Sequence, residues 1–195
     1  NGSGVYALVP TPNIVSSLIA GLTPSSATNA TPDLGDFDDD GDIDLISGNG
    51  RGEILFFENA GSSSAPNFLP GFRLERPLGT STAIIRVGST TTTNSAPAMI
   101  DYDTDGDMDV VVGRANGEFV YLENIGGGLF DYYDTPDFTF TNPLRNSNFD
   151  KGSQSVPHVI DWDCDGDLDI VASYTNGVGT VQFWMFRRLS NNSFT

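Results

Sequence analysis

A ten-residue acidic motif occurs three times in this 195-residue chain, at residues 36–45, 101–110 and 161–170. Each copy has the form Asp-x-Asp-x-Asp-Gly-Asp-x-Asp and ends in Leu, Val or Ile. Successive copies begin 65 and 60 residues apart. Internal repetition of this kind is typical of a chain built from several copies of one structural unit. The sequence therefore predicts three repeats that share one fold.

The similarity between the copies extends beyond the acidic motif. Glu-Asn pairs at 58–59 and 123–124 lie 22 residues after the first aspartate. A proline lies four residues before the first aspartate of each motif, at Pro32, Pro97 and Pro157. A glycine lies 16 residues after that aspartate, at Gly52, Gly117 and Gly177. We expect an uncharged N-terminal segment at 1–30, repeat 1 at 31–95, repeat 2 at 96–155, and an incomplete repeat 3 at 156–195.

Each repeat is predicted to consist of β-strands. A short β-branched segment such as 109–113 follows the acidic motif, and a turn signal such as Asn116-Gly117 or Asn176-Gly177 comes next. Second strands are expected at 53–58, 118–123 and 180–186, and aromatic strands at 68–74 and 130–140. With the strand that enters the motif, each repeat has about four strands, the size of a propeller blade. We therefore expect an all-β fold of three four-stranded, antiparallel, propeller-type blades.

The acidic motif predicts a loop that binds a hard cation. Carboxylates at positions 1, 3, 5 and 9 would repel one another unless the loop bends around an ion, and the glycine at position 6 permits the bend. Oxygen ligands favour Ca²⁺ over Zn²⁺, and Mg²⁺ usually keeps more of its waters. An EF-hand is excluded because it needs flanking helices and a glutamate at position 12, where this chain has Ser47, Val112 and Ala172. The sequence thus predicts about three bound Ca²⁺ ions.

This motif, followed by a β-branched strand, resembles the FG-GAP/VCBS repeat, the calcium-loop blade of integrin α-chain propellers. The resemblance covers residues 31–190 and implies that each loop lies between the first two strands of a blade and binds one Ca²⁺. The ligands implied by position are Asp36, Asp38, Asp40, Asp42 and Asp44; Asp101, Asp103, Asp105, Asp107 and Asp109; and Asp161, Asp163, Asp165, Asp167 and Asp169.

The number of repeats departs from the family pattern, because closed propellers have at least four blades. The chain is therefore a part of a longer propeller, or its blades associate with those of other chains, or they pack in a compact arrangement of their own. The N-terminal segment 1–30 contains apolar runs at 5–9 and 14–22 and is either a linker or a donor strand. A donor strand would complete the last blade within the chain or between chains.

Composition limits the partners. The chain carries 21 Asp and 5 Glu against 9 basic residues, a net charge of −17, so we expect neither nucleic acid nor an anionic membrane surface as a partner. No apolar run approaches the ~20 residues of a membrane span, so no membrane insertion is expected. The chain begins without Met, which is typical of a processed or trimmed product. Cys164 is the single cysteine, and candidate glycosylation sequons begin at Asn1, Asn29 and Asn191.

No catalytic constellation is recognisable, and the single histidine, His158, has no nucleophile pattern beside it, so no enzyme activity is expected. We expect a secreted or cell-surface calcium-binding repeat protein with a structural or adhesive role, which self-assembles into a fibre or coat or binds an extracellular protein or glycan. One alternative is a propeller-type lectin, in which Trp162, Trp184, Tyr132 and Tyr133 either stack on sugars or pack in a core. Another is a propeller fragment of a larger secreted enzyme or receptor.

Overall fold

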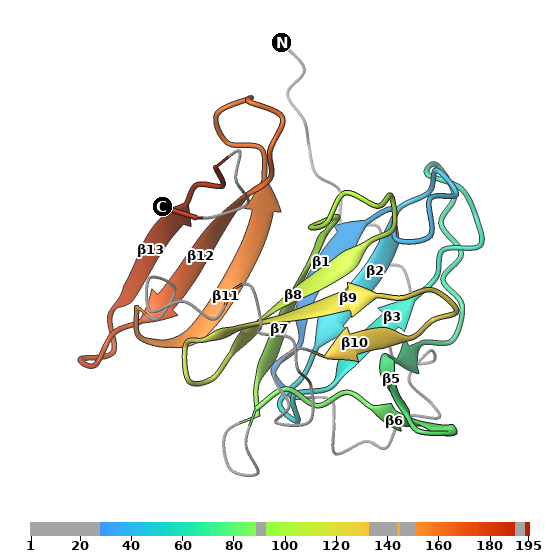
Figure 1. The fold of residues 1–195 in the computed structure, drawn as a ribbon, viewed down its shortest axis with the longest axis horizontal. Coiled ribbons are helices and arrows are strands. Elements are labelled where there is room, and N and C mark those ends of the chain that lie inside the picture. The colour runs from blue at the N-terminus through green and yellow to red at the C-terminus, as the bar shows by residue number, and fades with distance from the viewer. Residues whose placement is uncertain (1–27, 89–92, 133–143, 145–150, 190–193) are drawn as a thin grey trace.

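The computed structural model describes residues 28–88, 93–132, 144, 151–189 and 194–195 of the chain. Its regular elements within these ranges are strands, arranged in three antiparallel sheets and one separate hairpin (Figure 1). The all-β antiparallel fold that the sequence predicts is therefore confirmed. In the described part of the chain there is no helix of the length and hydrophobicity that crossing a bilayer requires.

Each sheet has its strands in chain order, so that every strand pairs with the one that follows it. The first sheet contains β1 (Thr31–Gly35), β2 (Asp44–Gly48), β3 (Ile54–Phe57) and β4 (Phe72–Arg73). The second contains β7 (Ser95–Ile100), β8 (Asp109–Arg114), β9 (Phe119–Asn124) and β10 (Phe130–Tyr132). The third contains β11 (Ser153–Ile160), β12 (Asp169–Thr175) and β13 (Val181–Phe186), and the hairpin pairs β5 (Glu75–Leu78) with β6 (Ser81–Ile84).

The strands lie close to the predicted positions, with two differences. The hairpin of β5 and β6 has no counterpart in the prediction. The turn predicted at Asn176-Gly177 is present, because the Gly179 backbone nitrogen donates to the Asn176 carbonyl at 2.9 Å, but the connection between β12 and β13 is longer than a two-residue turn: the Asn176 backbone nitrogen donates to the Thr180 carbonyl, also at 2.9 Å. The candidate donor strand falls on residues 1–27, which lie outside the described residues.

The second sheet lies between the other two and is covered on both faces. One core joins the first sheet and residues that follow it to the second sheet, with Ile46, Ile54 and Phe56 packed against Val110 and Leu122. The other core joins the opposite face of the second sheet to the third and contains Ile100, Val111, Tyr121, Ile170, Tyr174 and Phe186. This double coverage explains why all six residues of β8 are buried.

Glycines set the distance between neighbouring sheets. A Cβ atom on Gly48 would lie 2.0 Å from the Ser95 carbonyl oxygen, and one on Gly113 would lie 2.1 Å from that of Ser155. Both oxygens belong to the first strand of the next sheet. The third sheet has Ser173 at the equivalent place, because it pairs with Val156 as Gly113 pairs with Ala96. The close approach is therefore built into the first two sheets alone.

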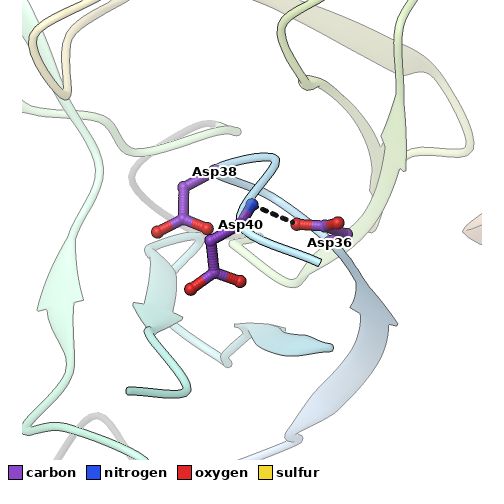
Figure 2. A group of neighbouring side chains, drawn as sticks. All are labelled: Asp36, Asp38 and Asp40. Carbon is purple, nitrogen blue, oxygen red and sulfur yellow. Dashed lines mark hydrogen bonds between the residues drawn. The ribbon is translucent and has the colours of Figure 1, made fainter. Parts of the chain in front are cut away.

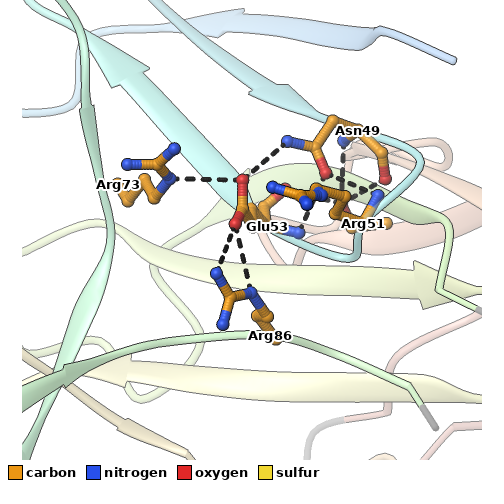
Figure 3. A network of polar contacts seen from close by, with 6 residues as sticks. Asn49, Arg51, Glu53, Arg73 and Arg86 are labelled. Atoms are coloured by element: carbon orange, nitrogen blue, oxygen red, sulfur yellow. Dashed lines mark hydrogen bonds and ion pairs between the residues drawn. The ribbon is translucent and has the colours of Figure 1, made fainter. Parts of the chain in front are cut away.

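A buried carboxylate anchors the end of β3 (Figure 3). Glu53 is completely buried, and its two oxygens accept from Arg86 Nη2 at 2.7 Å, from Arg73 Nε at 3.2 Å and from Asn49 Nδ2 at 3.2 Å. Burial opposes its ionisation, but the hydrogen bonds from Arg86, Asn49 and Arg73 outweigh burial and hold the pKa of Glu53 below its usual value. The cluster joins β3 to β4 and to the segment that follows β6.

Candidate metal loops

The three acidic motifs form three loops of the same shape, each between the first two strands of its sheet. They connect β1 to β2, β7 to β8, and β11 to β12. Position 6 is a glycine with φ between 91° and 98° in every loop, at Gly41, Gly106 and Gly166. Position 4 has φ between 58° and 63°, at Asp39, Thr104 and Cys164. The glycines take a backbone conformation that other residues avoid, which produces the predicted bend.

Three carboxylates converge in the first loop (Figure 2), and three converge in the third. In the first loop they belong to Asp36, Asp38 and Asp40, whose nearest oxygens all lie within 4.8 Å of one another. Asp36 accepts from the backbone nitrogens of Asp40 and Gly41 at 3.1 and 3.0 Å, which folds the loop over its own first residue. Asp161, Asp163 and Asp165 form the equivalent cluster of the third loop.

The second loop gathers a different set, Asp101, Asp103 and Asp109, within the same 4.8 Å. Its Asp101 Oδ1 and Asp107 Oδ1 are buried and make no hydrogen bond. A buried carboxylate oxygen without a partner is costly, and a cation ligated at that point would satisfy it. The donor set therefore fits a hard, oxygen-seeking cation such as Ca²⁺.

Position 9 joins each loop to its sheet. Asp44, Asp109 and Asp169 are 0%, 0% and 1% exposed. Their Oδ2 atoms accept a hydrogen bond from the backbone nitrogen of position 2 of the same loop. Their Oδ1 atoms accept from the backbone nitrogens of Asn59, Asn124 and Arg188, and each of these three Oδ1 bonds measures 2.8 Å. The Asn59 and Asn124 side chains also donate to the carbonyl of position 8, both at 3.2 Å. The repeated Glu-Asn pair of the sequence thus closes the loop from the third strand.

In the first two loops, the surroundings of several aspartates disfavour the ionised form of their carboxyl groups. Removal from water raises the pKa of Asp38, Asp103 and Asp107, and neighbouring carboxylates add to the increase. Burial raises the pKa of Asp109 to about 6, although the Tyr121 hydroxyl donates to it at 2.6 Å. A bound divalent cation would reverse this effect by favouring the charged carboxylates.

The third loop differs from the other two because the guanidinium group of an arginine contacts its carboxylates. Arg187 forms an ion pair with Asp163 through Nη2, and the same atom lies 3.4 Å from Asp165 Oδ2. The pKa of Asp165 is lowered, first by the hydrogen bond from the Asp167 backbone nitrogen and also by Arg187. No lysine or arginine in the described part of the chain pairs with a carboxylate of the first or second loop. The spacing of the sequence motif gave no sign of this arginine.

The remaining predicted ligands lie at the loops but outside the clusters. They are Asp42, Asp44, Asp105, Asp107, Asp167 and Asp169. Asp105 accepts from the backbone nitrogen of Asp107 at 3.1 Å, as Asp40 and Asp165 do from position 7 of their own loops. Ligation by these side chains stays a prediction.

The other singled-out residues lie in varied surroundings. Cys164 is exposed at position 4 of the third loop. Trp162 and Trp184 are 60% and 41% exposed, whereas Tyr132 is buried and its hydroxyl accepts from an arginine at 2.9 Å. Asn29 is exposed at the start of the described chain, and the candidate sequon residues Asn1 and Asn191, like Tyr133, lie outside the described residues.

Comparison with known proteins supports the interpretation of the motif. Residues 36–112, from the first acidic loop to the middle of β8, match the family model of the FG-GAP-like repeat. A search of the curated proteins found no match. The match includes the first two acidic loops, and it confirms the family resemblance that the acidic motif indicates.

Proposed function

We propose that the acidic loops of these FG-GAP-like repeats bind calcium ions, and that the ions stabilise an extracellular module with a structural or adhesive role. The observation that supports this most directly is the second loop. Its carboxylates converge within 4.8 Å, and two buried oxygens, on Asp101 and Asp107, have no hydrogen-bond partner. An ion held there would fix the connection between β7 and β8, so binding and folding are coupled.

The compartment follows from the affinity expected of such sites. Calcium sites of extracellular modules have dissociation constants of about 10⁻⁴–10⁻³ M, which millimolar calcium fills and cytosolic calcium does not. A site of ~10⁻⁴ M at ~10 mM calcium would stabilise the fold by about 2.7 kcal/mol. For a chain of this size each kcal/mol raises the melting temperature by roughly 2–4 °C.

The experiment is thermal melting of the full chain in calcium and in EGTA. We expect calcium to raise the melting temperature by roughly 5–10 °C for each tight site. Asp40→Ala and Asp105→Ala should each reduce that increase. Asp131→Ala removes the same charge from β10, outside the loops, and should leave it unchanged. A melting temperature that does not respond to EGTA would show that the loops are not calcium sites.

For the self-assembly, we favour addition of a strand to β13. Its outer edge has no partner strand among the described residues, whereas β3 and β9 pair with β4 and β10 at the corresponding edges. Val181, Phe183 and Met185 on β13 are 56%, 76% and 46% exposed. Stacking on the face of the third sheet is less suitable, because Ser173 stands where the other sheets have glycine.

The uncharged segment within residues 1–27 of a neighbouring chain is the proposed donor strand. Light scattering should show that the full chain associates and that a chain without residues 1–27 does not. A synthetic peptide of that segment should bind the shortened chain. Equal association of both chains would refute the donor role.

A second candidate function is carbohydrate binding. A cleft of about 500 Å³ lies between the first two loops, and Phe37, Phe56 and Phe72 line it together with Asp38 and Asp107. Aromatic faces beside carboxylates suit a sugar ring and its hydroxyl groups. Glycan-array binding that is lost in EGTA and in Phe72→Ala would favour this function, and the absence of any bound glycan would count against it.

A further inference from the structure

The hydrogen bonds at position 9 show which residues correspond in the three units. The backbone nitrogen that donates to the Oδ1 atom of position 9 belongs to Asn59, Asn124 or Arg188, 15, 15 and 19 residues later in the chain. The residue immediately before this donor is Glu58 in the first unit, Glu123 in the second and Arg187 in the third. One position beside the loop therefore carries a negative charge twice and a positive charge once.

Arg187 uses that position to reach into the third cluster. Its Nη2 atom contacts Asp163 Oδ2 and lies 3.4 Å from Asp165 Oδ2, and these are two of the three carboxylates that converge there. The arginine side chain is 49% exposed, and those of Asp163 and Asp165 are 27% and 37% exposed. Among the described residues, buried carboxylate oxygens without a partner occur in the second loop, on Asp101 and Asp107, and in neither the first nor the third.

We propose that Arg187 is a built-in counter-ion of the third loop, so that the three loops are not equivalent: the first two bind calcium tightly, and the third is closed by the guanidinium and binds calcium weakly. This inference rests on the proposed calcium function. A calcium ion that enters the third cluster has to displace the guanidinium from Asp163 and Asp165, and it meets a like charge until it does. Among the described residues, no lysine or arginine pairs with a carboxylate of the first or second loop, where Glu58 and Glu123 occupy the equivalent position.

Calcium titration of the full chain by calorimetry tests the inference. We expect two tight sites in the unaltered chain and a third that is weaker by about tenfold or more. Arg187→Glu gives the third unit the charge of the other two, and Arg187→Gln removes the charge alone. Both variants should raise the affinity of the third site by about tenfold or more. Arg51→Gln, which removes an exposed arginine of the first sheet's hairpin, is the matched control and should change neither the number of tight sites nor their affinity.

A second pair of variants keeps the proposal testable if replacement of Arg187 disturbs folding. Asp40→Asn should remove one tight site, because it alters the first loop. Asp165→Asn should leave two tight sites, because it alters the arginine-closed loop. In EGTA, Arg187→Gln should lower the melting temperature, and calcium should then raise that temperature by more than in the unaltered chain.

The outcomes separate this inference from the function on which it rests. Three equal sites in the unaltered chain, with no change in Arg187→Gln, would overturn the role of Arg187 and leave calcium binding intact. Loss of a tight site in Asp165→Asn would do the same. A titration without any binding in the unaltered chain would overturn both proposals.

Discussion

Replacement of Gly113 by alanine should push the second and third sheets apart. The added Cβ atom would lie 2.1 Å from the Ser155 carbonyl oxygen and 2.8 Å from Pro157 Cδ, whereas ordinary contact begins at 3.4 Å. The neighbouring atoms are backbone and a proline ring, so no flexible side chain can move aside. The strands would have to separate by about 1 Å, which also stretches the 2.9 Å hydrogen bond from the Arg114 backbone nitrogen to Ser155 Oγ.

The expected cost follows from this overlap. Overpacking of a tight core usually costs about 1–3 kcal/mol, and rigid neighbours place Gly113→Ala at the upper end, at about 2–3 kcal/mol. For a chain of 195 residues this corresponds to a melting temperature lower by roughly 4–12 °C. Urea denaturation in calcium buffer should give the same loss of free energy, provided that the slope against urea concentration does not change.

Gly177→Ala is the matched control, because a Cβ atom there would meet nothing within 4 Å. Its melting temperature should change by less than about 2 °C. If Gly113→Ala is as stable as this control, the close approach of the sheets at Ser155 is not a feature of the folded protein in solution, and the reasoning fails.

Three further predictions concern single residues. In EGTA the melting temperature should be higher at pH 5 than at pH 7.5. Burial raises the pKa of Asp109 to about 6, so the contribution of this group to stability is complete below pH 4 and is lost as the pH rises through 6. A decrease in melting temperature on acidification would contradict this prediction. Glu53→Gln should lower the free energy of unfolding by about 3 kcal/mol in urea denaturation, since it leaves Arg73 and Arg86 around an uncharged group. An unchanged midpoint of urea denaturation would refute the anchoring role. Thr104→Asn should stabilise the second loop by about 0.5–1 kcal/mol, because a β-branched residue is strained at φ 63° and asparagine tolerates it; a lower melting temperature would argue against that strain.

The acidic loops could be predicted from the sequence because their signals are local. The aspartates and the glycine of each motif fix the bend within ten residues, and the β-branched segment that follows each motif forms β2, β8 or β12 in the structure. The expected loop position, between the first two strands of each unit, is confirmed for the same reason. Which carboxylates converge could not be predicted, because the second loop brings in Asp109 where the others bring in Asp40 and Asp165.

The role of Arg187 could not be predicted because it depends on the length of a distant hairpin. A count from Asp161 at the spacing of the first two units reaches Phe183 and Trp184, where those units have Glu-Asn. The hairpin between β12 and β13 is four residues longer, so the structure brings Arg187 and Arg188 to that place instead. The hairpin of β5 and β6 was missed for another reason, because Pro77 and mixed polar residues give it no alternating pattern.

The central place of the second sheet makes unfolding a shared event. One face of this sheet belongs to the core with the first sheet and the other face to the core with the third, so neither core can open without exposing apolar surface of the same strands. Units that share a layer in this way melt as one cooperative block rather than one after another. The loss of an ion from a single loop should therefore lower the protection of backbone amides against hydrogen exchange in all three sheets, including the sheet whose loop is held by Arg187.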